Sequence, residues 1–144
     1  MVITVIGMGF VGLTAAVGFA AKGHQVYGIE KNDARRHCIE NGELPFFEPE
    51  MQEYLAQTLN RNFYIQKEQN GAVESSDCVF YCVGTPVGEN GCADLNFLTV
   101  AIKETLSILP KNSGTTLVVK STVPPGTLRD RVLPLVCQSG LTPG

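Results

Sequence analysis

Long apolar runs and basic blocks are both missing from this 144-residue chain. No segment approaches the roughly 20 apolar residues that a membrane-spanning helix needs. The apolar residues 1–6 have no basic region before them and soon meet glycine, which disfavours a signal peptide. The net charge is −3 and the chain has no basic cluster, so it lacks the positive surface with which proteins bind a nucleic-acid backbone. We therefore expect a cytoplasmic protein that binds neither membranes nor nucleic acid.

The five cysteines also lack the pattern of a metal site. They are odd in number, form no Cys-x-x-Cys pair and have no histidine beside them at zinc spacing. We expect reduced thiols that serve as small buried hydrophobes, and no metal site. These residues are Cys38, Cys78, Cys82, Cys92 and Cys137.

What is present fits one globular domain over residues 1–144. Hydrophobic residues make up 44% and charged residues 17% of the chain, close to ordinary usage for a soluble domain. A chain of this length buries about 68–70% of its unfolded surface, enough for one core. No internal linker, repeat or low-complexity tract divides it.

Strand-like and helix-like segments alternate along the chain. Strands are expected at residues 2–6, 25–30, 63–65, 78–83 and 115–120. Helices are expected at residues 10–22, 33–41, 51–59, 95–109 and 127–138, with Asn32 or Asp33 and Asp94 as N-caps. Such alternation with short connections predicts an α/β fold, a Rossmann-type doubly wound parallel sheet of order 3-2-1-4-5 with helices on both faces.

A glycine-rich turn, Gly7-Met8-Gly9-Phe10-Val11-Gly12, follows the first expected strand and opens the first expected helix. In this position Gly7 permits the tight turn, Gly9 lets a pyrophosphate approach the backbone, and Gly12 lets the helix pack close to the strands. The free N–H groups and the dipole of the helix N-terminus favour an anion there. The turn therefore predicts a dinucleotide site.

Glu30 lies eighteen residues beyond Gly12, where such folds place a carboxylate that accepts hydrogen bonds from the adenosine ribose. The carboxylate would repel the 2′-phosphate that NADP carries on this ribose. The presence of Glu30 therefore predicts that the site selects NAD over NADP. Lys31 and Arg35 work against this selection, because nearby cations would offset the repulsion.

Three segments together resemble the N-terminal NAD-binding domain of the UDP-glucose/GDP-mannose dehydrogenase family, and the likeness covers essentially the whole chain. They are the glycine-rich turn with Phe10-Val11, the segment Val83-Gly84-Thr85-Pro86 with Ala93-Asp94-Leu95, and the segment Lys120-Ser121-Thr122-Val123-Pro124-Pro125-Gly126-Thr127.

In that family NAD accepts hydride twice as the C6 alcohol of a nucleotide sugar becomes a carboxylate, through intermediates held on a cysteine. The resemblance implies that Thr122 is an auxiliary catalytic residue near the reacting carbon, and that Lys120 is a strand-end cation instead of a base. The expected cofactor-binding residues are Gly7, Gly9, Phe10, Val11, Gly12, Glu30, Lys31, Arg35, Val83, Gly84, Thr85, Pro86, Ser121 and Thr122.

Several departures from the family pattern bear on function. The family's Glu-Pro-Gly-Leu is Glu48-Pro49-Glu50-Met51 here, and its usual ribose aspartate is Glu30. No cysteine here matches the motif of the nucleophile, and Cys82 is expected inside a strand as part of the core. The resembling enzymes continue with a dimer-forming helix and the nucleophilic cysteine, so the resemblance implies that this chain is a piece of a longer, homodimeric enzyme, without turnover by itself.

The substrate implied for that enzyme is UDP-glucose, because the Val-Gly-Thr-Pro and Lys-Ser-Thr-Val-Pro segments suit that branch. Residues 132–135 resemble the GDP-mannose branch, so GDP-mannose or a UDP-N-acetyl-hexosamine stays an alternative. A hydroxyacid or hydroxyacyl-CoA dehydrogenase would share the start of the chain but leaves residues 120–127 unexplained. A regulatory NAD sensor is the remaining alternative.

Overall fold

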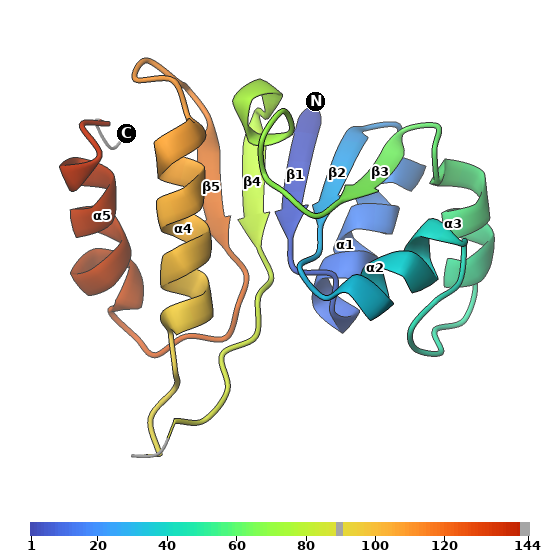
Figure 1. Cartoon of the computed structure of the whole chain (residues 1–144), viewed down its shortest axis with the longest axis horizontal. Helices are drawn as coiled ribbons and strands as arrows, with labels where there is room; N and C mark the ends of the chain where they lie inside the picture. Colours follow the sequence, from blue (N-terminus) through green and yellow to red (C-terminus); the bar gives the residue numbers. More distant parts are fainter. Residues whose placement is uncertain (89–90, 142–144) are drawn as a thin grey trace.

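Five parallel strands form a single sheet in the computed structural model, which describes residues 1–88 and 91–141 (Figure 1). Their order, β3-β2-β1-β4-β5, confirms the predicted topology. Each neighbouring pair is parallel, with Ile3 opposite Val26 on one side and Cys78 on the other. The strands are β1 (Val2–Ile6), β2 (Gln25–Ile29), β3 (Phe63–Gln66), β4 (Cys78–Tyr81) and β5 (Thr116–Val119).

Helices cover both faces of the sheet, as expected. Ile3 and Val5 of β1 pack in one cluster with residues of the first three helices, whereas Ile6 packs in a second cluster with residues of the later helices. This division follows from the alternation of side chains along a strand. The helices are α1 (Phe10–Ala21), α2 (Asp33–Glu40), α3 (Met51–Thr58), α4 (Asn96–Ile108) and α5 (Leu133–Gln138), with a short 3₁₀ turn, η1, at Val73–Ser75.

Several expected boundaries were wrong by a residue or two, and two of these differences lie near the candidate site. β4 ends at Tyr81, so Cys82 lies just after the strand and is half-buried instead of lying inside the core. α4 begins at Asn96 with Leu95 at the N-cap, and Asp94 accepts a hydrogen bond from the Asn96 N–H at 2.9 Å. Asp94 thus closes a local turn before the helix, a role that competes with N-capping for this residue type. Of the two predicted caps for α2, Asn32 is the N-cap and accepts from the Arg35 N–H at 2.8 Å, whereas Asp33 is the first residue of the helix.

The last expected helix is divided into two parts. A π-helical segment, η2 (Leu128–Val132), precedes α5, and Pro134 lies in the first turn of α5. Proline has no N–H to donate, which disfavours a continuous α-helical ladder through this point. Val132, Leu135 and Val136 of the expected apolar stripe pack against the core, but Leu128 is 53% exposed.

Glu50, at the position where the family pattern has glycine, has a left-handed backbone with φ 64°. A side chain in this conformation costs about 1–2 kcal/mol, and glycine avoids the cost but loses more chain entropy on folding. We expect Glu50→Gly to raise the free energy of unfolding by about 0.5–1 kcal/mol in urea denaturation.

Asn60→Gly is the matched control for this prediction. Asn60 is the other non-glycine residue with positive φ (59°) in the described chain, and asparagine tolerates that conformation well. Its substitution should therefore change stability less than Glu50→Gly does. Equal effects of the two substitutions would show that Glu50 is not strained.

Within residues 1–88 and 91–141, no helix combines the length and the apolar character that crossing a bilayer requires.

Candidate dinucleotide-binding site

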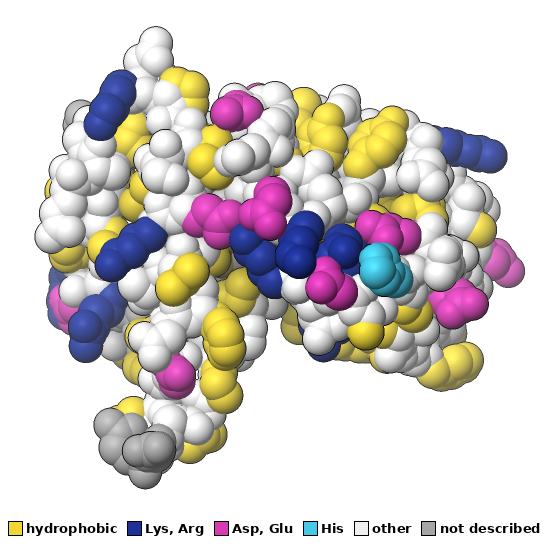
Figure 2. Space-filling view, viewed as in Figure 1, with side chains coloured by type: hydrophobic (Ala, Val, Ile, Leu, Met, Phe, Trp, Pro, Cys, Tyr) yellow, Lys and Arg dark blue, Asp and Glu magenta, His cyan; other side chains and the backbone are white. Residues whose placement is uncertain are grey.

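The expected site residues follow the carboxyl ends of strands β1, β2, β4 and β5, which share one edge of the sheet. In Figure 1 this is the lower edge, where the chain leaves β1 for α1 and leaves β4 for the long connection to α4. Figure 2 shows a notch in the lower outline of the molecule between these two regions. Open α/β sheets bind their ligands outside this edge, at the point where the strand order reverses.

The three glycines of the β1–α1 turn meet different surroundings. A Cβ on Gly7, which has φ +94°, would lie 2.8 Å from the Cys82 carbonyl oxygen, and a Cβ on Gly12 would lie 1.8 Å from the Gly7 oxygen. These two positions require glycine for close packing. A Cβ on Gly9 would meet nothing within 4 Å. Gly9 therefore faces open space, as a position approached by a ligand does.

The turn is anchored to β2 by its own backbone. The Gly7 N–H donates to the Ile29 oxygen at 2.8 Å, and the Met8 N–H donates to Glu30 Oε2 at 3.0 Å. No side chain of the described residues caps α1, and its first turn contains no acidic residue. The first N–H groups of a helix have no partner inside it, so those of α1 are left for an anion.

Glu30 is buried, with 6% of its surface exposed, and is held by three donors. Oε2 accepts from Met8 N–H and from Arg35 Nη1, both at 3.0 Å, and Oε1 accepts from the Asn32 N–H at 2.8 Å. A carboxylate offers about four acceptor positions. One position on Oε1 is therefore left, enough for one hydroxyl group.

The loops after β4 and β5 are tied together. Thr85 Oγ1 donates to the Thr122 oxygen at 2.7 Å, and Ser121 Oγ donates to the Val83 oxygen at 2.7 Å. The structure thus brings four of the expected site residues into one unit, with Gly84 exposed in the same loop. Thr122 is exposed at the end of this unit, with its neighbour Ser121 half-buried.

The start of α1 carries an apolar surface. Phe10 is 53% exposed and Val11 is 46% exposed. The Phe10 ring lies 4.9 Å from that of Phe46, centroid to centroid, in a tilted arrangement. Phe46 comes from the irregular segment between α2 and α3, and no local pattern in the sequence points to this contact.

Lys31 and Arg35 were both expected to face the cofactor, but their side chains have partners inside the protein. Arg35 pairs with Glu30, whereas Lys31 reaches away to Glu68 and Glu104. Neither acidic residue was foreseen, because each is more than thirty positions from Lys31 in sequence. Met8 was also missed, since it contributes only its backbone N–H, a group that sequence does not single out.

Cys82 lies beside the site without being activated. Burial raises the pKa of its thiol, and the positive charge of Lys120 offsets only part of that effect. Since the thiolate is the nucleophilic form, a raised pKa disfavours a nucleophilic role. In the described residues, no group of three or more His, Cys, Asp or Glu side chains is arranged to hold a metal ion.

A separate cavity of about 710 Å³ opens between the start of α4 and Arg131. Asp94, Asn96 and Thr99 are among its lining residues, and the glycine-rich turn is not. The cavity therefore lies on the α4 side of the sheet edge, away from the proposed phosphate position.

The sequence model of the UDP-glucose/GDP-mannose dehydrogenase family, NAD binding domain, matches residues 1–142. The chain belongs to this family. It is the NAD-binding domain of the family's nucleotide-sugar 6-dehydrogenases, with a Rossmann fold and NAD as cofactor. The resemblance carried by the three sequence motifs is thereby confirmed.

Individual relatives differ in the sugar named. UDP-glucose 6-dehydrogenase of Rhizobium meliloti is 37% identical over 88% of this chain and 29% of its own length. A ternary complex of GDP-mannose dehydrogenase from Pseudomonas aeruginosa is 34% identical, with TM-score 0.90 over 97% of this chain and 33% of that one. UDP-N-acetyl-mannosamine dehydrogenase Cap5O from Staphylococcus aureus is 29% identical, with TM-score 0.88 over 98% of this chain and 34% of that one. The chain therefore spans about a third of the length of these relatives.

Proposed function

We propose that this chain binds NAD across the carboxyl edge of its sheet, as the cofactor domain of a longer enzyme that oxidises UDP-glucose to UDP-glucuronate. The observation that supports this cofactor site is the uncapped N-terminus of α1. It has open space over Gly9, and the Glu30 carboxylate lies beside it. A pyrophosphate fits the first feature and a ribose hydroxyl fits the second.

Each part of the site has a distinct task in this proposal. The N–H groups of Phe10, Val11 and Gly12 bind the pyrophosphate, and Glu30 accepts one hydrogen bond from the adenosine ribose through Oε1. Bound NAD supplies the hydride acceptor for oxidation of the sugar alcohol. The tied loops after β4 and β5, with Thr85 and Thr122, line the end of the site nearer the reaction, and Thr122 holds a water there.

A fluorescence titration with NADH, in parallel with NADPH, tests the cofactor site directly. We expect saturable NADH binding that NAD competes away, and weaker binding of NADPH. Repulsion between Glu30 and a 2′-phosphate at contact distance is worth roughly 1–4 kcal/mol, or about five- to a thousandfold in affinity. If the folded chain does not bind NADH, the proposed site is wrong. If it binds NADPH as tightly as NADH, the proposed role of Glu30 is wrong.

The sugar specificity rests on the motifs at residues 83–86 and 120–124, which favour the UDP-glucose branch. Residues 132–135 favour GDP-mannose instead, so this is the second candidate. Steady-state turnover of the longer protein with each sugar nucleotide separates the two.

We propose that the longer protein is a cytoplasmic homodimer. We also propose that residues 1–144 alone turn over neither substrate, because no cysteine here matches the nucleophile's motif.

A further inference from the structure

Lys31 directly follows the carboxylate proposed to select NAD, and its cation would oppose that selection if it faced the cofactor. A free ammonium group beside Glu30 would attract a 2′-phosphate and offset the repulsion from the Glu30 carboxylate. Arg35 already pairs with Glu30 at 3.0 Å, so the position of the Lys31 ammonium group determines whether a second cation weakens the discrimination between the two cofactors.

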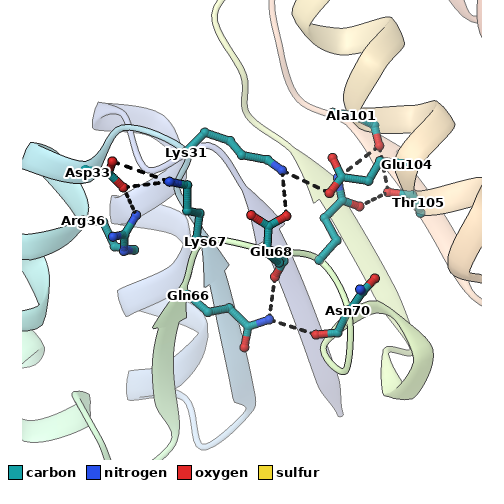
Figure 3. Close-up of polar contacts among 11 residues, drawn as sticks. Lys31, Asp33, Arg36, Gln66, Lys67, Glu68, Asn70, Ala101, Glu104 and Thr105 are labelled. Carbon is teal, nitrogen blue, oxygen red and sulfur yellow. Dashed lines mark hydrogen bonds and ion pairs between the residues drawn. The ribbon is translucent and has the colours of Figure 1, made fainter.

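The Lys31 ammonium group lies between two carboxylates. Nζ is 3.0 Å from Glu104 Oε1 and 3.2 Å from Glu68 Oε2. Glu68 follows β3 and Glu104 belongs to α4, so Lys31 connects the loop after β2 to a helix on the opposite side of the strand-order reversal (Figure 3). Two of the three ammonium donors are thereby used inside the protein.

Neighbouring charges leave no surplus of positive charge. Asp33 pairs with Lys67 at 3.1 Å, and Arg36 pairs with Asp33 and Glu40. With Glu30 and Arg35 included, five carboxylates face four cations around the end of β2; they are Glu30, Asp33, Glu40, Glu68 and Glu104, against Lys31, Arg35, Arg36 and Lys67. Figure 2 shows this surface as mixed acidic and basic side chains instead of a basic patch.

Lys31 stays charged in this setting. Partial burial alone lowers its pKa, but the hydrogen bonds and the attraction of Glu104 and Glu68 outweigh that effect and raise the pKa above its usual value. The ammonium group is therefore a full cation at neutral pH, whichever partner it faces.

We propose that Glu68 and Glu104 are specificity-determining residues of the cofactor site. By holding the Lys31 ammonium group away from the adenosine ribose, they preserve the repulsion between Glu30 and a 2′-phosphate. To bind NADP through Lys31, the chain would have to break both ion pairs and leave two carboxylates uncompensated near the phosphate. This inference rests on the proposed NAD site.

The test compares NADH and NADPH binding to the 144-residue chain and to Glu68→Gln/Glu104→Gln. Each exposed ion pair is of modest strength, so releasing Lys31 should tighten NADPH binding about three- to tenfold while NADH binding changes less than about twofold. The gain should shrink in 0.5 M salt, where the Debye length falls to about 4 Å.

Two further variants assign the gain to its cause. Adding Lys31→Gln to the double variant should remove the gain, whereas a gain from lost negative charge alone would survive it. Glu53→Gln, at an exposed position of α3, removes one negative charge where the double variant removes two, and it should leave both affinities unchanged.

The outcomes separate the two proposals. If wild type binds NADH but the NADPH to NADH ratio is the same in the double variant, the specificity inference is wrong and the cofactor site stands. A gain that persists with Lys31→Gln, or appears equally in Glu53→Gln, also overturns the inference. If the folded wild type binds neither cofactor, the proposed site fails and the inference fails with it.

Discussion

Gly12→Ala is expected to lower the free energy of unfolding by about 3 kcal/mol or more. The new Cβ would lie 1.8 Å from the Gly7 oxygen and 3.0 Å from the Cys82 Cβ. The Gly7 oxygen is a backbone atom and the Cys82 Cβ is attached directly to the backbone, so neither can rotate away and α1 must move away from the β1 turn. Overpacking in cores costs about 1–3 kcal/mol, and contact with backbone places this case at or above that range.

Urea denaturation measures this loss, and the slope of the transition reports whether unfolding stays two-state. NADH binding should also disappear, since the N–H groups of α1 move with the helix. A loss below about 1 kcal/mol would mean that the helix shifts easily and that Gly12 is not needed for packing.

Gly9→Ala should have the reverse profile, with nearly unchanged stability and at least about tenfold weaker NADH binding. Gly9 has φ −70° and ψ −172°, which any residue adopts, and its Cβ would meet nothing in the protein. The loss of glycine entropy in the unfolded chain favours alanine by a few tenths of a kcal/mol or more, and the weaker N-cap preference of alanine opposes it.

The expected loss of binding comes from the ligand side. A methyl group over Gly9 occupies the space through which a pyrophosphate approaches the N–H groups of α1. The same titration of Gly9→Ala and wild type measures the effect. Unchanged NADH affinity in Gly9→Ala would place the phosphates elsewhere, whatever the result with Gly12→Ala.

The fold was predictable because its signals are local. The β-branched run at residues 2–6 and the small apolar residues of α1 are short-range patterns, and the alternation of strands and helices then limits the topology. The glycine-rich turn and Glu30 were found in the same way, since both have fixed offsets from β1.

The predictions that failed depend on longer-range contacts or on competing local bonds. Asp94 bonds to Asn96 in its own turn, so α4 starts later than its residue type suggested. Cys82 has a strand-like sequence context, but β4 ends one residue before it. The partners of Lys31 come from two distant segments, and sequence periodicity contains no information about that pairing.

The three bonds to Glu30 have a consequence for any redesign of the cofactor preference. In the proposed site this carboxylate would accept from the ribose while it holds the Met8 N–H of the glycine-rich turn, so recognition of the sugar and of the phosphates would be mechanically coupled. Replacing Glu30 to admit a 2′-phosphate would also release the turn to which we assign the pyrophosphate. A change of preference in this domain is therefore better sought among the charges around Glu30 than at Glu30 itself.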